Sequence, residues 1–129
     1  MEKIILFILI LVITLGCDKN KVDEDCIEYR TAFVRNVTAP SNGTTNNDIP
    51  IEVSFTVING CGNFSEFLET RNGNNKSIEV QTKYEGCICT QAVETLSVIY
   101  VFNEQTTGFY ELIFRSSDTK FISVSITIE

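Results

Sequence analysis

The sequence predicts an all-β protein, a sandwich of antiparallel sheets built from seven strands. Two observations predict it: apolar residues recur at every second position along several segments, and runs of turn-forming residues separate these segments. Alternation with a period of two is typical of strands that have one face in a core and the other in water. Residues 51–57, which read IEVSFTV, show it most clearly. Short strands with turn signals between them are typical of a β-sandwich.

Each strand has its own pattern. The first, third and fourth strands, at roughly 26–38, 64–71 and 76–85, rest on weaker alternation, whereas the second, at 51–58, alternates strictly. The intervening runs APSNGTTNND, RNGNN, NEQTTG and SSDT consist of residues that favour turns. The last three strands have their apolar positions at Leu96, Val98, Tyr100 and Phe102, at Tyr110, Leu112 and Phe114, and at Ile122, Val124, Ile126 and Ile128.

A short motif refines the prediction to an immunoglobulin-like (Ig-like) sandwich. Gly108, Phe109 and Tyr110 open the sixth strand directly after a polar turn. A tyrosine in this place resembles the tyrosine corner of Ig-like domains, in which the hydroxyl bonds back to the backbone of the preceding corner. An ordinary core tyrosine is the alternative, and the sequence leaves both open.

Four cysteines predict two disulfides. They are Cys26, Cys61, Cys87 and Cys89, and an even number of cysteines in a small exported domain is typical of a disulfide framework. Because only one residue separates Cys87 from Cys89, a bridge between these two would be strained. Each is therefore expected to pair with either Cys26 or Cys61, and a thiolate metal site is the alternative.

The expected strand order places the cysteines together. If successive strands alternate in direction, the start of the first strand and the loops after the second, fourth and sixth strands share one end, and all four cysteines fall there. The opposite end then carries three loops rich in Asn, Thr and Gly, at Ala39–Ile49, Arg71–Lys76 and Asn103–Thr107. Loops on a rigid sandwich are the usual place for binding residues, and the alternative is that these are only soluble turns.

The N-terminal residues predict export. Residues 1–17 read MEKIILFILILVITLGC, a basic start followed by an almost unbroken apolar run. This run is shorter than the ~20 residues that a membrane-spanning helix needs, and its flanks are typical of a secretory signal. A retained membrane anchor is the alternative.

The end of this segment predicts lipidation. Gly16 and Cys17 resemble the lipobox of bacterial lipoproteins, although Thr14 and Leu15 depart from its usual pattern. The resemblance implies that Cys17 carries acyl chains such as palmitate. It divides the chain into a signal peptide at 1–16, the lipidated cysteine with a polar tether at 17–25, and an Ig-like domain at 26–129.

The composition argues against several classes of function. The net charge of −7 makes the chain a poor binder of polyanions, so no nucleic-acid partner is expected. The chain has no histidine, which removes the commonest general base and the commonest metal ligand. We also find no Gly-rich phosphate loop and no nucleophile elbow. We therefore expect no enzymatic activity, no catalytic residue, no cofactor and no metal site.

A wider resemblance rests on two stretches. Residues 86–91 read GCICTQ, and after a further strand Gly108, Tyr110, Leu112 and Phe114 follow at alternate positions. Together they resemble small lipoproteins of the Bacteroides–Flavobacterium type. The resemblance covers most of the chain after Cys17 and implies an exported Ig-like domain, and it carries no activity, substrate or catalytic residue.

Three hypotheses of function follow. The first is a non-enzymatic lipoprotein of the bacterial cell envelope, held at the outer membrane by its N-terminal lipid, which binds a protein or glycan partner or supports an assembly. The second is a thiol-redox or metal-handling protein of the envelope that uses Cys87 and Cys89. The third is a surface glycan-binding accessory protein, in which Phe64, Phe67 or Tyr84 would stack on sugars because the chain has no Trp. Whether the domain faces the periplasm or the outside stays open.

Overall fold

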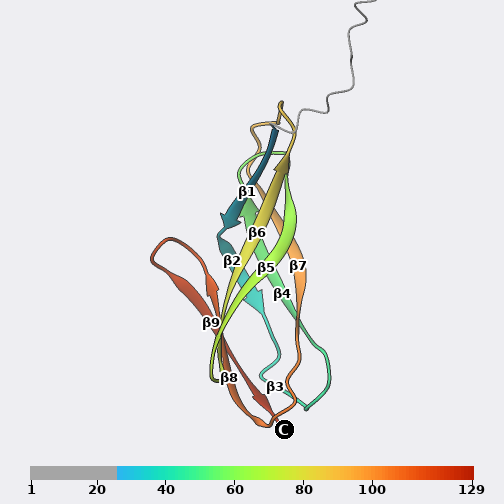
Figure 1. Ribbon diagram of the computed structural model, residues 1–129, viewed down its shortest axis with the longest axis vertical. Helices are drawn as coiled ribbons and strands as arrows, with labels where there is room; N and C mark the ends of the chain where they lie inside the picture. The colour runs from blue at the N-terminus through green and yellow to red at the C-terminus, as the bar shows by residue number, and fades with distance from the viewer. Residues whose placement is uncertain (1–25) are drawn as a thin grey trace, which may run out of the picture.

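The computed structural model describes residues 26–129, which form nine strands in two sheets (Figure 1). The predicted all-β fold is confirmed, and the predicted number of seven strands is wrong. The strands are β1 (Ile27–Ala32), β2 (Val34–Thr38), β3 (Asn42–Gly43), β4 (Ile49–Val57), β5 (Gly62–Asn72), β6 (Asn75–Glu85), β7 (Glu94–Phe102), β8 (Gly108–Arg115) and β9 (Phe121–Ile128).

Both additional strands lie near the start of the domain. The segment 26–38, predicted to be one strand, is divided at Phe33, because β1 pairs with β6 in one sheet and β2 pairs with β4 in the other. Ala32 and Val34 are both buried, so the alternation continues across Phe33 and does not reveal the change of sheet. β3 has only two residues, which pair with β9 in a run that was expected to be a loop.

β6 organises the larger sheet. β5 pairs along one edge of β6, while β1 and β8 share the other edge, β1 at Val80–Glu85 and β8 at Asn75–Ile78. β9 and then β3 continue the sheet beyond β8, and the smaller sheet has the order β2-β4-β7. The pairs β6–β8 and β3–β9 are parallel, so the prediction of purely antiparallel sheets is wrong. β6 and β8 run in the same direction because the one strand between them in sequence, β7, belongs to the other sheet.

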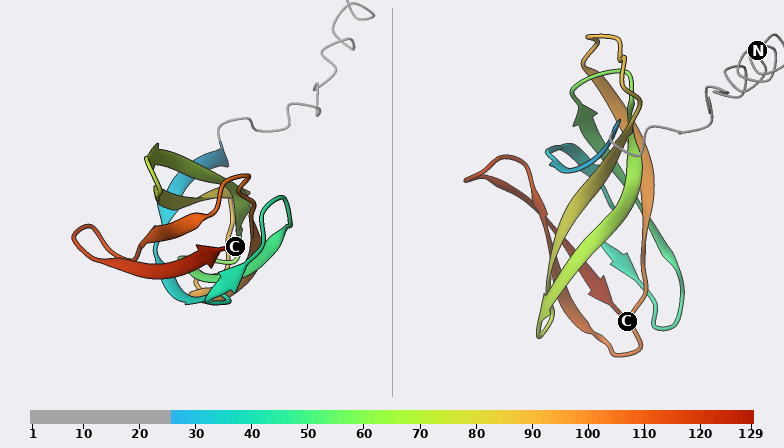
Figure 2. Two further views of the ribbon diagram at one scale, coloured as in Figure 1. Left: turned by 90° about the horizontal axis from the view of Figure 1, so that it is seen from below. Right: turned by 45° about the horizontal axis from the view of Figure 1, so that its top comes forward.

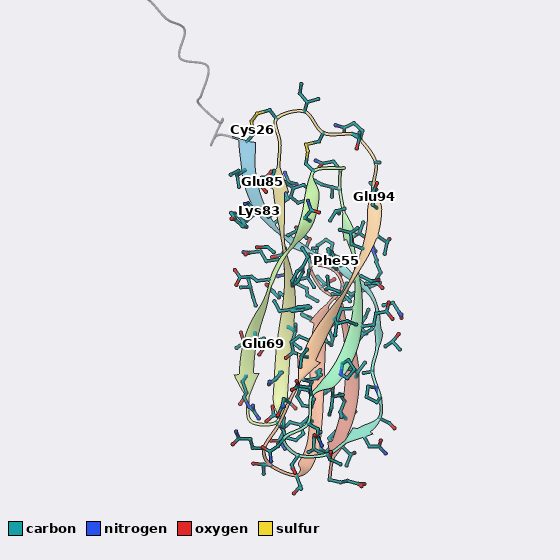
Figure 3. All side chains as sticks on the ribbon, turned by 90° about the vertical axis from the view of Figure 1, so that its right-hand side faces the viewer. Cys26, Phe55, Glu69, Lys83, Glu85 and Glu94 are labelled. Carbon is teal, nitrogen blue, oxygen red and sulfur yellow. A yellow bond between two sulfur atoms is a disulfide. The ribbon has the colours of Figure 1, made fainter. Side chains whose placement is uncertain are left out.

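The core lies between the sheets and consists of the inward-facing residues of the alternating strands. The four apolar side chains of IEVSFTV in β4 are fully buried, and Phe55 lies near the middle of the molecule (Figure 3). Rings of the two sheets meet in the core, since Phe67 of β5 and Phe114 of β8 both contact Tyr100 of β7 edge-on. The other buried apolar residues are Ala32, Val34, Ile49, Ile78, Val80, Tyr84, Phe102, Tyr110, Leu112, Ile126 and Ile128.

The molecule is elongated and its two ends differ (Figure 2). The start of β1, the β4–β5 loop and the β6–β7 loop lie at one end, which we name the disulfide end (Figures 1 and 3). The β3–β4, β5–β6 and β7–β8 loops lie at the other, which we name the distal end. The predicted grouping of loops is confirmed except for the β8–β9 loop, which projects from the side. It falls short of the disulfide end because β8 and β9 have eight residues each, against eleven in β5 and β6.

The predicted signal peptide at 1–16, the lipidation of Cys17 and the tether at 17–25 fall outside the described residues. Within 26–129, no helix is long and apolar enough to cross a membrane.

Candidate binding surface at the distal end

Glu104, in the β7–β8 loop, is the buried centre of the distal end. Its side chain is 8% exposed and contacts two cations from the β5–β6 hairpin. Arg71 donates two hydrogen bonds to the carboxylate, from Nη1 to Oε1 at 2.9 Å and from Nη2 to Oε2 at 3.0 Å. Lys76 Nζ lies 3.3 Å from Oε1. The pairing compensates the cost of burying a charged group and joins two loops that are distant in sequence.

The same contacts fix the charge of the cluster. Burial alone would raise the pKa of Glu104, but hydrogen bonds from Arg71 and Lys76 outweigh burial, so the pKa lies below its ordinary value. The hydrogen bond to Glu104 also raises the pKa of Arg71. Burial, followed by the nearby Glu69 carboxylate, raises the pKa of Tyr100. At neutral pH these groups hold constant charge states, which suits them to holding loops in place.

The β3–β4 loop is tied to the Glu104 loop. Asn46 N–H donates to the backbone oxygen of Glu104 at 2.9 Å, and Asn103 Nδ2 donates to Asp48 Oδ1 at 2.7 Å. Asn46 has a φ of 61°, in the left-handed region that Asn tolerates better than most residues. Some of the asparagines that mark these loops in the sequence therefore maintain the loop conformation.

The β5–β6 turn is tied to the start of β8. Asn74 Nδ2 donates to the backbone oxygen of Phe109 at 3.1 Å, and Glu111 N–H donates to the backbone oxygen of Asn74 at 3.1 Å. The Tyr110 hydroxyl donates to the backbone oxygen of Thr106 at 2.7 Å. This bond returns to the preceding corner, as in a tyrosine corner, so the predicted corner is confirmed.

The outer surface of the distal end is polar, with many amide and hydroxyl side chains beside the exposed Asp48 and Arg71. Amide side chains offer both donors and acceptors of hydrogen bonds, and the tied loops hold them in place. Phe109, which is 62% exposed at the start of β8, adds an apolar ring. The surface can therefore bind a polar ligand through many hydrogen bonds. Its exposed amide and hydroxyl residues are Asn42, Thr44, Asn46, Asn47, Asn72, Asn74, Asn75, Asn103, Gln105, Thr106 and Thr107.

One family model matches the chain. The model of the ORF11 beta-sandwich domain matches residues 51–127. The chain belongs to the ORF11 beta-sandwich domain family. The ORF11 match begins in β4 and ends in β9, so it covers strands of both sheets, the β5–β6 and β7–β8 loops, and three of the four cysteines in the domain. Neither a curated protein nor a solved structure matches the chain.

At the disulfide end of this ORF11 sandwich, the four cysteines form two bridges (Figure 3). Cys26 is bonded to Cys87 and Cys61 to Cys89, with Cα–Cα distances of 5.0 and 5.4 Å. The prediction that Cys87 and Cys89 each pair with one of the other two is confirmed. No group of three or more Cys, Asp or Glu side chains within 26–129 is placed to hold a metal ion.

The aromatic residues proposed for sugar stacking are not exposed platforms, and that prediction is wrong. Phe64 and Phe67 pack against the core with their ring centroids 4.9 Å apart. Tyr84 is 6% exposed, and its hydroxyl accepts a hydrogen bond from Ile58 N–H at 3.0 Å. These rings face inward because they occupy the core side of β5 and β6. Phe109 is the exposed aromatic residue of the distal end. The sequence pattern could have shown this, because Phe109 is next to the inward-facing Tyr110 and neighbouring residues of a strand point to opposite faces.

Proposed function

We propose that this chain is a non-enzymatic lipoprotein of the bacterial cell envelope, of the Bacteroides–Flavobacterium type. Cys17 carries the lipid after removal of residues 1–16, and residues 17–25 connect the lipid to the Ig-like domain. The domain binds a partner through its distal end. The N-terminal pattern of export and lipidation signals supports the anchoring.

The observation that carries the binding role is the construction of the distal end. Three loops from separate parts of the chain are tied through Glu104, Asn46 and Asn74, and they present amides and hydroxyls to solvent. A surface organised before binding loses little conformational entropy when a ligand arrives. The chain enters the domain at Cys26, at the opposite end, so a lipid anchor leaves the distal end accessible.

A glycan is the partner that one observation favours. Phe109 is 62% exposed at the start of β8, and its backbone oxygen accepts a hydrogen bond from the Asn74 side chain of the β5–β6 turn. A sugar can stack on such an exposed ring while its hydroxyls bond to amides of the distal loops. We expect Phe109→Ala to abolish the strongest signals on a glycan array. Phe121→Ala is the matched control, because Phe121 is 55% exposed on β9. An array that is inert to the unaltered protein would exclude the glycan and leave a protein partner.

The thiol-redox function is less well supported by the disulfides. Redox sites commonly place two cysteines close enough to bond with one another, whereas Cys87 and Cys89 are bonded to Cys26 and Cys61. Each bridge therefore joins the β6–β7 loop to another part of the chain, Cys87 to the residue before β1 and Cys89 to the β4–β5 loop, which is what a structural disulfide does.

Two measurements test the proposed function. Mass spectrometry of the mature protein should find acyl chains on Cys17, and Cys17→Ser should remove them and release the protein from the membrane fraction. An impermeant protease applied to intact cells should then remove the domain if it is surface-exposed. A domain that resists until the outer membrane is opened, and that is cleavable when purified, faces the periplasm. A mature chain that keeps residues 1–16 and lacks acyl chains would contradict the proposal.

A further inference from the structure

The disulfide end carries a concentration of exposed apolar residues. Ile88 is 96% exposed, Val93 69%, Ile58 46% and Ile27 41%. All four lie in the β4–β5 loop, in the β6–β7 loop or at the start of β1, and these segments form this end of the molecule (Figure 1). Large apolar side chains that gather on one exposed surface commonly mark a contact with a membrane or another protein.

This apolar tip is free of charge. The loop residues 58–61 and 86–93 contain no charged side chain in a chain whose net charge is −7. Within residues 26–129, charged side chains follow directly behind the tip: Glu28 is paired with Arg30 at 2.7 Å, Glu85 is paired with Lys83 at 3.0 Å, and Glu94 begins β7. An uncharged apolar tip with charged side chains behind it suits a bilayer of electrically neutral lipids, because the tip would meet the apolar layer and the charges would stay at the headgroups.

The tip is also held in a fixed conformation. Ile88 lies between the two bridged residues Cys87 and Cys89. Gly60 N–H donates to the backbone oxygen of Thr90 at 2.9 Å, which joins the two loops of the tip. Because the loop is already ordered, exposing Ile88 to a bilayer requires little further ordering.

The place where the chain enters the domain indicates what contacts the apolar tip. Cys17 precedes Cys26 by nine positions, which span at most about 32 Å when fully extended. Under the proposed function, on which this inference rests, the lipid on Cys17 therefore keeps the membrane within that distance of the disulfide end. We infer that the disulfide end contacts the anchoring membrane, with Ile88 and Val93 inserted among the lipids and the distal end directed away.

A single tryptophan can test this contact, because the chain has none. The full lipidated chain carrying Ile88→Trp is reconstituted into phosphatidylcholine vesicles with or without brominated acyl chains, which quench indole emission at close range. Insertion of the apolar side chain into the headgroup boundary should shift the emission to the blue, and the brominated lipid should quench most of it. Val93→Trp, at a second exposed position of the tip, should behave alike. Phe109→Trp, at the distal end, is the control and should keep a water-exposed emission without quenching.

Flotation of the vesicles separates the possible failures. If the protein floats but the indole at position 88 stays unquenched, the membrane contact is wrong and the anchoring stands. Equal quenching at positions 88 and 109 would also overturn the inference, since the domain would then lie flat on the lipid. If the protein does not float, and the Cys17→Ser chain behaves identically, the anchoring itself fails and this inference fails with it.

Discussion

Removing each disulfide separately should destabilise the domain by unequal amounts. The perturbations are the paired substitutions Cys26→Ser with Cys87→Ser, and Cys61→Ser with Cys89→Ser, which leave no free thiol within the domain. The two bridges close loops of 61 and 28 residues. A disulfide stabilises mainly by restricting the unfolded chain, and the restriction grows with the logarithm of the loop length.

The two bridges interlock, so each effective loop depends on the other. With Cys61–Cys89 intact, the path from Cys26 to Cys87 shortens to about 37 residues, which corresponds to about 3.8 kcal/mol. With Cys26–Cys87 intact, two chain paths connect Cys61 to Cys89, one direct and one through the other bridge. Together they act as a loop of about 17 residues, so the Cys61–Cys89 bridge contributes about 3.1 kcal/mol. We therefore expect the loss of the Cys26–Cys87 bridge to cost about 0.7 kcal/mol more than the loss of the other.

Urea unfolding, followed by far-ultraviolet circular dichroism, measures both losses. The free energies of unfolding are extrapolated to water, and the slopes against urea show how much the unfolded states expand. Full reduction of the unaltered protein should remove about 7 kcal/mol, enough to unfold many domains of this size. A reversed ranking, or losses below about 1 kcal/mol for both variants, would refute an origin in chain entropy.

Two further substitutions test the distal end. Tyr110→Phe should lower the free energy of unfolding by about 1 kcal/mol, because it removes one hydrogen bond to the backbone of Thr106. The control is Tyr29→Phe, at a 54% exposed position, which should change the free energy of unfolding by less than about 0.5 kcal/mol. Equal effects of the two substitutions would contradict a role for the tyrosine corner. Glu104→Gln should cost about 1.5–3 kcal/mol at pH 7. The pKa of Glu104 in the folded state is depressed below its ordinary value of 4.5. The ionised carboxylate therefore stabilises the fold at pH values above the unfolded pKa, and this stabilisation is lost as the pH falls through the folded pKa. The difference between Glu104→Gln and the unaltered protein, measured by urea unfolding from pH 7 to pH 3, should therefore shrink on acidification, and a constant difference would contradict the ion pairing.

The features that were predictable from sequence are those recorded in local patterns. The alternation of IEVSFTV placed β4 and its buried face correctly, and the one-residue spacing of Cys87 and Cys89 excluded their direct bridge. The division at Phe33 was not predictable, because the change of sheet depends on which distant strands β1 and β2 pair with. Glu104 was missed for the same reason. In the sequence it is one polar residue of a turn, and only the long-range approach of Arg71 and Lys76 makes it the buried centre of the distal end.

The two ends of the sandwich are stabilised by different chemistry, and they should respond independently. Reducing agents act on the bridges at the disulfide end, whereas acid acts on Glu104 at the distal end. Along β6, Lys76 of the distal cluster and Glu85 beside the bridges are nine positions apart, or roughly 30 Å at 3.3 Å per residue. Perturbations this far apart without a shared partner usually add to within about 0.5 kcal/mol.

This independence can be measured with a double-mutant cycle. The cycle combines Glu104→Gln with the Cys61→Ser and Cys89→Ser pair, and the free energies of unfolding are compared at pH 7. We expect the combined loss to equal the sum of the separate losses within about 0.5 kcal/mol. A larger coupling would mean that the β-strands between the ends transmit strain. The distal surface would then keep its shape only while the bridges are intact, and reduction of the bridges would weaken partner binding as well as the fold.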